Sequence, residues 1–185
     1  QLLLAVARSI DGDGKVDQVY FSKTELAGWL GYARGGGRTV KQAASKIQRR
    51  SARWNDNFFR YKAGKQQLSY VSAGANGVAM RILPIVLANH QNWDMTRREI
   101  LRNGLSTHGH PRAHLGAVLF ALCIERILVY RPNDFDSAAF LVSLGQELEV
   151  AVSWDFGADP DVADWMRRWA SETGAGYETA YAEVV

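Results

Sequence analysis

Several features that would narrow the class of this protein are scarce in its sequence or missing from it. The 185 residues contain one cysteine, Cys123, which excludes an internal disulfide and is typical of a cytoplasmic protein. Cys123 lies in an apolar run, where we expect a small core residue. No run of about 18 apolar residues is present, so we expect no membrane-spanning helix. The apolar opening segment, residues 1–8, is short and lacks a basic leader, which argues against a signal peptide.

Complete metal-binding patterns are missing as well. Asp11 and Asp13 resemble the start of a calcium loop, but Ser22 stands where the final glutamate is required, so we expect a plain turn. His110 and His114 have the spacing of two metal ligands on one helix, but no third cysteine, glutamate or aspartate stands near them in the sequence. We therefore expect no zinc site and assign no metal ligand within the chain.

The sequence does contain a clear helical pattern. Its apolar fraction of 47% is ordinary for a globular protein, and 185 residues fit one domain with a sizeable core. Apolar residues recur at helical spacing, whereas no alternating strand pattern and no internal repeat are visible. We therefore predict an all-α fold in which residues 1–185 belong to one domain. The expected helices cover residues 2–10, 21–32, 39–52, 81–87, 95–103, 111–124, 135–152, 162–170 and 177–185.

The ends of several helices are predicted from capping residues. Ser22, followed by Glu25, has the form of a capping box at the start of the second helix. Thr39 is expected to cap the third helix. Gly104 is expected to end the helix of residues 95–103 in the left-handed conformation. Pro111 suits the first turn of the helix that follows it.

Charge is distributed unevenly along the chain. Residues 1–114 carry 18 Lys and Arg against 7 Asp and Glu, a formal charge of +11, whereas residues 115–185 carry 4 against 12, or −8. A basic half could attract nucleic acid or a phosphorylated small ligand. The basic helix of residues 39–52 is not accompanied by an aromatic stacking platform, so we expect no nucleic-acid partner. We favour a fold in which the two halves lie against each other and partly neutralise each other's charge.

The most informative stretch is residues 72–81, a turn rich in glycine and alanine that leads into an apolar segment. Gly74 and Gly77 permit backbone angles that other residues avoid, and both allow a ligand to approach closely. Backbone N–H groups of such a turn point outward, and a helix beginning near Gly77 would add unpaired N–H groups and a positive dipole end. The stretch therefore predicts a phosphate-binding loop. The alternative is a small-residue turn that only lets two helices pack closely.

Two further segments carry candidate ligand-binding residues. His108 and His110 stand in a loop just before Pro111, at the entrance of a helix. The triple glycine of residues 35–37 stands between Arg34 and Arg38. It has the composition of a phosphate-binding turn, but we favour a flexible turn with two solvated charges.

Taken together, these segments resemble a known family. Asn76–Arg81, followed by Pro84, resembles the Asn-Gly-x-Ala-Met-Arg-x-x-Pro signature of the ADP-ribosylglycohydrolases. Thr107–Pro111 resembles their Thr-His-x-His-Pro segment. Residues 1–7 are similar to the helix that follows their Thr-Asp-Asp-Thr motif, and residues 35–39 fit the glycine-rich turn before their next helix.

The resemblance spans most of residues 1–125 and implies a multi-helix orthogonal bundle that hydrolyses the bond between ADP-ribose and its acceptor. The implied partner is an ADP-ribosylated protein or a small ADP-ribose derivative. The loop would cradle the diphosphate, Asn76 would donate from its side chain, His108 would face the phosphates and His110 would brace the loop. Ala75 departs from the family pattern, which has glycine before the asparagine. The implied ligand-binding residues are Ser72, Ala73, Gly74, Ala75, Asn76, Gly77, His108 and His110.

The resemblance also implies Mg²⁺ as cofactor, with two ions held by carboxylates and threonines of two separate motifs. Neither motif occurs in this sequence, since one would precede Gln1 and the other would follow Val185. Asp159 and Asp161 match neither of them. We therefore expect the central part of one domain, incomplete at both ends and inactive alone, from a magnesium-dependent ADP-ribosyl glycohydrolase.

Two other functions remain open at this point. One is a non-catalytic ADP-ribose or nucleotide-binding module of the same helical shape. The other is a basic helical protein that binds nucleic acid, which a steep loss of duplex binding with salt would reveal. The sequence also leaves open whether the acceptor is arginine, serine or a free ADP-ribose derivative.

Overall fold

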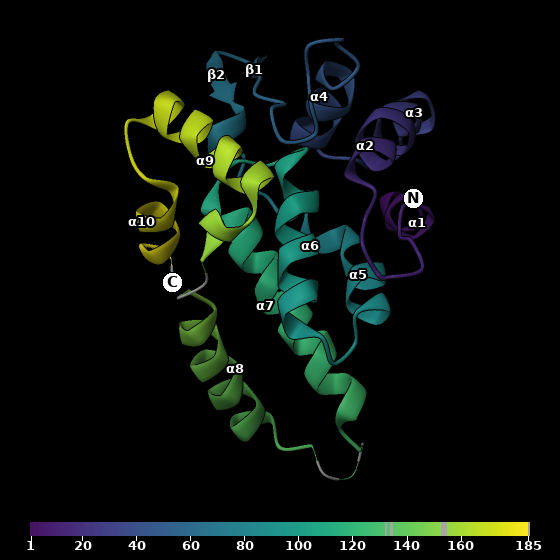
Figure 1. Ribbon diagram of the computed structural model, residues 1–185, viewed down its shortest axis with the longest axis vertical. Coiled ribbons are helices and arrows are strands. Elements are labelled where there is room, and N and C mark those ends of the chain that lie inside the picture. The colour runs from purple at the N-terminus through teal and green to yellow at the C-terminus, as the bar shows by residue number, and fades with distance from the viewer. Residues whose placement is uncertain (132, 134, 153–154, 185) are drawn as a thin grey trace.

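Helices dominate the structure, a computed structural model that describes residues 1–131, 133, 135–152 and 155–184 (Figure 1). In this part of the chain the sheet content is one antiparallel pair, β1 (Arg60–Ala63) with β2 (Gln66–Ser69). The all-α prediction is therefore confirmed. The α-helices are α1 (Leu2–Arg8), α2 (Gln18–Tyr20), α3 (Ala27–Trp29), α4 (Arg38–Lys46), α5 (Leu83–Ala88), α6 (Trp93–Leu105), α7 (Pro111–Val129), α8 (Ser137–Val152), α9 (Pro160–Thr173) and α10 (Tyr177–Ala182).

Helix α7 runs through the middle of the molecule and organises the other elements (Figure 1). Helix α6 packs along it, α1 and α5 lie on one side, and α9 and α10 lie on the other. Helix α4 and the hairpin sit at the end where α6 finishes and α7 begins. The loop between α6 and α7 therefore faces the hairpin end of the molecule. No helix in the described ranges, α7 included, is long and apolar enough to cross a membrane.

Two buried clusters hold α7 in place. The first contains Val6 of α1, Ile85 of α5 and Val118 of α7, which are almost fully excluded from solvent. The second is aromatic, with the rings of Trp165 and Tyr177 in edge contact at 4.6 Å between centroids. Burial of such side chains contributes about 1.5–3 kcal/mol each, so the clusters fix α7 and the loop before it from both sides.

The hairpin corrects the expectation that the chain contains no strands. The register pairs Tyr61 with Leu68, and these two residues face inward while their neighbours are mostly exposed. Gly64, in the connecting turn, has φ of 64°, which glycine adopts without strain. Strands of four residues, mostly polar, are too short to give a visible alternation.

Three predicted helix ends are also wrong. Asp17, not Ser22, caps the second helical segment by accepting from Tyr20 N at 2.8 Å, and the helix continues from Gln18 through a π-helical turn at Phe21–Leu26. Gly37, not Thr39, is the N-cap of α4. Gly104 lies inside α6, which ends one residue later at Leu105.

The predicted start of α7 at Pro111 is confirmed. Proline suits this position because its missing N–H would have no partner in the first turn. Pro84 likewise stands in the first turn of α5. Local backbone chemistry is therefore predicted correctly at Pro111, whereas α9 begins at Pro160 and not at residue 162 as expected, and starts where several residues compete to cap a helix are predicted wrongly.

Candidate functional site

A cleft of about 600 Å³ opens at the hairpin end of the molecule. Its walls come from the start of α1, the turn before α4, the hairpin, the segment of residues 75–77 and His108. This volume is within the range of about 300–1,000 Å³ that is usual for small-molecule sites. Segments far apart in the sequence therefore meet around one cavity.

The structure divides the predicted phosphate loop into two halves. Ala75, Asn76 and Gly77 line the cleft. Ser72 lies outside the lining and donates its hydroxyl to Ser69 O at 2.8 Å. Ala73 is buried, and Gly74 packs against the ring of His110. The second half of the loop is thus the part that a ligand in the cleft can reach.

The backbone of this second half offers free donors. Among the described residues, none accepts a hydrogen bond from the N–H groups of Ala75, Asn76 or Gly77. The expected helix at Gly77 is a short 3₁₀ turn at Ala79–Arg81, followed by α5. The dipole of such a short turn is weak. Unpaired N–H groups, rather than a helix dipole, are therefore the donors that this wall offers to the cleft.

His108 lies beneath Gly77 at the cleft wall. A Cβ atom on Gly77 would come within 2.6 Å of His108 Cε1 and 2.9 Å of Val40 Cγ2, so this approach requires glycine. His108 is buried, and burial, assisted by Arg81 and His114, lowers its pKa to about 3. The ring is therefore neutral at physiological pH. Within the described chain its Nε2 atom has no hydrogen-bond partner.

Arg81 joins the two loops that the sequence singled out. Its guanidinium donates to Gly77 O at 3.0 Å, to Thr107 Oγ1 at 2.9 Å and to Asn103 through both the side chain and the backbone oxygen. Arg81 is fully buried, and burial lowers its pKa. Arginine keeps its charge even so. A buried cation with several acceptors fixes these segments relative to one another.

The pair His110 and His114 does not form a joint site. His110 is the N-cap of α7 and accepts from Arg112 N at 3.1 Å, and it lies outside the cleft lining. His114 is buried in the aromatic cluster, where its Nδ1 contacts the Tyr177 hydroxyl. Burial lowers the pKa of His114 to about 3. The first histidine braces a helix start and the second belongs to the core.

The described residues do not fit a magnesium pair. Among them, no three His, Cys, Asp or Glu side chains converge on a point that could hold a metal ion. The part of the cleft lining that the structure describes carries no carboxylate, which is the ligand that Mg²⁺ requires most. The described part of the cleft therefore offers no carboxylate that could hold a metal ion in it.

Other cleft residues were not predicted as a site. Arg34, Arg38 and the glycines between them line the cleft, whereas their sequence favours a flexible turn with two solvated charges. Gly36 lets this turn lie on the indole of Trp29, because a Cβ atom there would come within 2.4 Å of the ring. Two arginines around a triple glycine are a signal in the sequence that could have predicted this wall of the cleft. Tyr61, which reaches the cleft from the hairpin, has no such signal because the hairpin is hidden in the sequence.

Comparison with known proteins gives one result that covers the chain. The model of the family described as ADP-ribosylglycohydrolase matches residues 1–184. A search of curated proteins and a search of solved structures gave no match. With a match over nearly its whole length, and with both signature segments at one cleft, this chain belongs to the ADP-ribosylglycohydrolase family.

Proposed function

We propose that this chain belongs to a hydrolase that removes ADP-ribose from a modified protein side chain or a small acceptor, and that the cleft binds the diphosphate. The carrying observation is the row of unpaired backbone N–H groups at Ala75, Asn76 and Gly77 beside a neutral His108. A diphosphate offers several charged oxygens, and backbone donors are well suited to such groups.

The remaining walls suit the rest of ADP-ribose. Arg34, in the turn before α4, and Arg38, the first residue of α4, add positive charge to the cleft wall. Tyr61, Leu68 and Met80 give an apolar surface for a nucleoside. A mainly apolar cavity with a few placed donors is the usual form of a cofactor-sized site. Of the ligand-binding set proposed from the sequence, Ser72 to Gly77 with His108 and His110, the members that line the cleft are Ala75, Asn76, Gly77 and His108, and these form the proposed diphosphate end.

The described residues bind and orient the ligand, and we assign none of them to activation of water. Hydrolysis adds water across the bond between the ribose and its acceptor. Magnesium dependence of that step is part of the proposal and rests on the family alone. The expectation that residues 1–185 by themselves do not turn over substrate also rests on the family alone.

A second candidate is a non-catalytic ADP-ribose-binding module. It is favoured by one observation, the lack of carboxylates in the described part of the cleft lining, because donors without acids bind anions without activating water. Binding and turnover therefore have to be measured separately.

The test combines calorimetry with ADP-ribose and an assay for ADP-ribose released from modified arginine and serine peptides, with magnesium and then with chelator. Replacing Asn76 by Ala should weaken ADP-ribose binding by about 1–3 kcal/mol, the usual cost of an unmet partner of a charged group. Gln66→Ala, an exposed amide on β2 outside the cleft lining, is the matched control. Binding without release would favour the module. Absence of binding in a folded protein would reject both candidates.

A further inference from the structure

Three residues behind the cleft wall form a continuous hydrogen-bond chain. Arg81 Nη2 lies 2.9 Å from Thr107 Oγ1, and Thr107 Oγ1 lies 2.8 Å from His108 Nδ1. All three side chains are fully excluded from solvent. The sequence of contacts therefore runs from a buried cation, through one hydroxyl, to the imidazole at the cleft.

The direction of the hydrogen bonds follows from counting donors and acceptors. Arginine can only donate, so Thr107 Oγ1 accepts from Arg81 and still has its own proton to give. One possible acceptor is Gly104 O at 3.3 Å, but this carbonyl already accepts the backbone N–H groups of Thr107 and His108, both at 3.0 Å. A carbonyl oxygen has two lone pairs, so the hydroxyl proton goes to His108 Nδ1.

A neutral imidazole carries one proton, and Nδ1 is occupied as an acceptor. We propose that Arg81 and Thr107 are positioning residues that hold His108 in the tautomer protonated at Nε2, so that it presents a fixed donor to an oxygen of the bound phosphate. The assignment of the phosphate rests on the proposed function. The assignment of the tautomer does not, because it follows from contacts in the free protein.

The fixed donor has a clear use at this position. His108 Nε2 is buried and has no partner in the described chain, and it lies under Gly77, whose N–H is likewise unpaired. A phosphate oxygen seated at Gly77 would satisfy both donors. The opposite tautomer would direct a lone pair at the anion and repel it. Arg81 and Thr107 touch no ligand themselves, and they act through the proton on His108.

The tautomer is read directly by nitrogen–proton correlation spectra of the whole chain labelled at histidine nitrogens. We expect the His108 pattern to show a protonated Nε2, and we identify it by its disappearance in His108→Gln. A protonated Nδ1 in the free wild-type protein would overturn the proposal whether or not ADP-ribose binds.

Variants of Thr107 test the chain of contacts. Thr107→Val removes the hydroxyl at nearly constant shape, and we expect loss of the fixed Nε2–H pattern and about tenfold weaker ADP-ribose binding, the effect of one hydrogen bond to a charged group. Thr107→Ser should restore both. Thr96→Val is the matched control, because Thr96 is equally buried and donates to Asn89 O, away from the cleft.

The outcomes separate the two proposals. A folded Thr107→Val with wild-type tautomer and affinity would overturn the positioning role. If Thr107→Val does not fold, Thr107→Ser decides the question. Loss of the Nε2–H pattern in Thr107→Ser would overturn the positioning role, and its retention would support that role. A wild-type protein that shows the Nε2–H pattern but binds no ADP-ribose would reject the proposed function. The positioning role of Arg81 and Thr107 would be retained.

Discussion

At the scale of single residues, Gly77 in the cleft wall matters because of space and not because of backbone angle. Gly74 and Gly77 permit backbone angles that other residues avoid, yet neither has positive φ. Gly77 is needed because His108 and Val40 leave no room for a Cβ atom. A local sequence cannot distinguish these two reasons, since the neighbour that fills the space comes from another element.

Gly77→Ala is expected to destabilise the protein and to weaken ADP-ribose binding, because the new methyl group must displace the His108 ring or the loop. Overpacking of this kind costs about 1–3 kcal/mol. Urea unfolding gives the stability and calorimetry gives the affinity. Gly12→Ala is the control, because a Cβ atom there meets nothing within 4 Å. Equal unfolding free energies and equal ADP-ribose affinities of the two variants would show that the loop does not contact His108 in solution.

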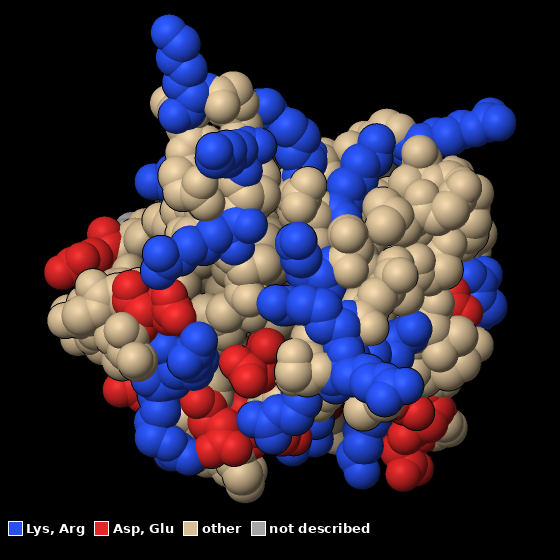
Figure 2. Space-filling view, turned by 90° about the horizontal axis from the view of Figure 1, so that it is seen from above, with Lys and Arg blue, Asp and Glu red and all other residues tan. Residues whose placement is uncertain are grey.

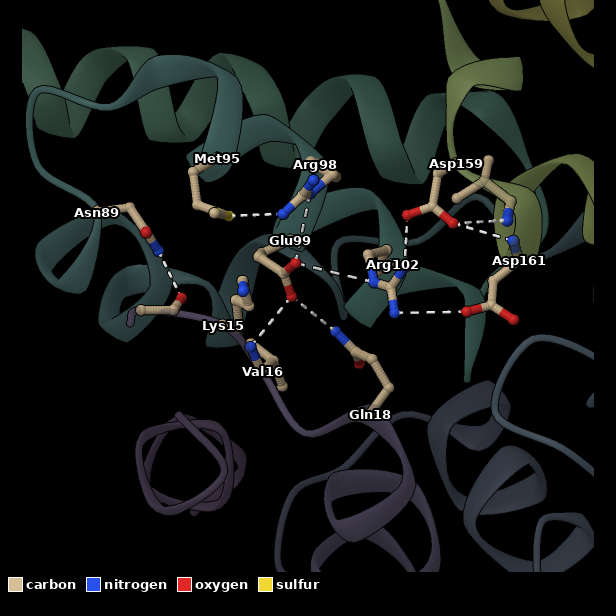
Figure 3. Close-up of polar contacts among 12 residues, drawn as sticks. Lys15, Val16, Gln18, Asn89, Met95, Arg98, Glu99, Arg102, Asp159 and Asp161 are labelled. Atoms are coloured by element: carbon tan, nitrogen blue, oxygen red, sulfur yellow. Dashed lines mark hydrogen bonds and ion pairs between the residues drawn. The ribbon is translucent and has the colours of Figure 1, made fainter. Parts of the chain in front are cut away.

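At the scale of elements, an ion-pair network ties α6 to the segment before α2 and to the start of α9 (Figure 3). Glu99 of α6 is almost fully buried and accepts from Val16 N at 3.1 Å and Gln18 Nε2 at 3.2 Å. Burial raises the pKa of Glu99, and Arg102 opposes that rise. Arg102 also pairs with Asp159, the N-cap of α9. The network fixes α6, and α6 ends at the loop that carries Thr107 and His108.

Arg102→Met should therefore destabilise the fold by about 2–3 kcal/mol, somewhat below the loss seen for fully buried pairs because Arg102 is partly exposed. The cost arises because Glu99 and Asp159 would each lose a partner at a buried or partly buried site. Arg167→Met is the matched control, since its pair with Asp164 is exposed on α9 and should contribute less than about 1 kcal/mol. Urea unfolding of both variants measures the difference. Equal losses in the free energy of unfolding would show that the network stabilises the fold no more than an exposed ion pair does.

Elements also show how far the sequence could predict this molecule. Long periodic segments such as α7 and α9 are predicted because their apolar spacing is set within the chain itself. The hairpin is missed because its two inward residues, Tyr61 and Leu68, are paired across the strands and give no periodic pattern along the chain. The two segments that carry the family signatures are recognised from the sequence alone. The residue that joins them, Arg81, is recognised only when its acceptors at Thr107 and Asn103 are in view.

At the scale of the whole molecule, the cleft opens on a basic face. Residues 26–93 contain eleven Lys and Arg and one acid, Asp56. Figure 2 shows Lys and Arg gathered over the end that carries α4 and the hairpin, with Asp and Glu mainly toward the lower part of that view. Arg34 and Arg38, at the cleft itself, form no ion pair with any described residue. The expected neutralisation between the two halves of the chain is thus incomplete here.

This charge distribution predicts that salt acts on the rate at which ADP-ribose associates. Exposed charges are screened over about 10 Å at 0.1 M salt, so the attraction of the doubly charged diphosphate should fade as ionic strength rises. We expect kon to fall several-fold between about 50 and 500 mM salt while koff changes less, as is usual for electrostatic steering. Stopped-flow fluorescence with a labelled ADP-ribose measures both rates.

Arg38→Gln should flatten this dependence, because it removes an unpaired charge from the cleft wall. Lys15→Gln, which removes an exposed charge outside the cleft lining, should leave the salt slope of kon unchanged, and it controls for the change in net charge. Equal slopes in wild type and Arg38→Gln, with the same affinity at high salt, would mean that the basic face does not guide the ligand. The attraction would then be confined to the short-range donors of Ala75, Asn76, Gly77 and His108, whose contacts salt screens far less.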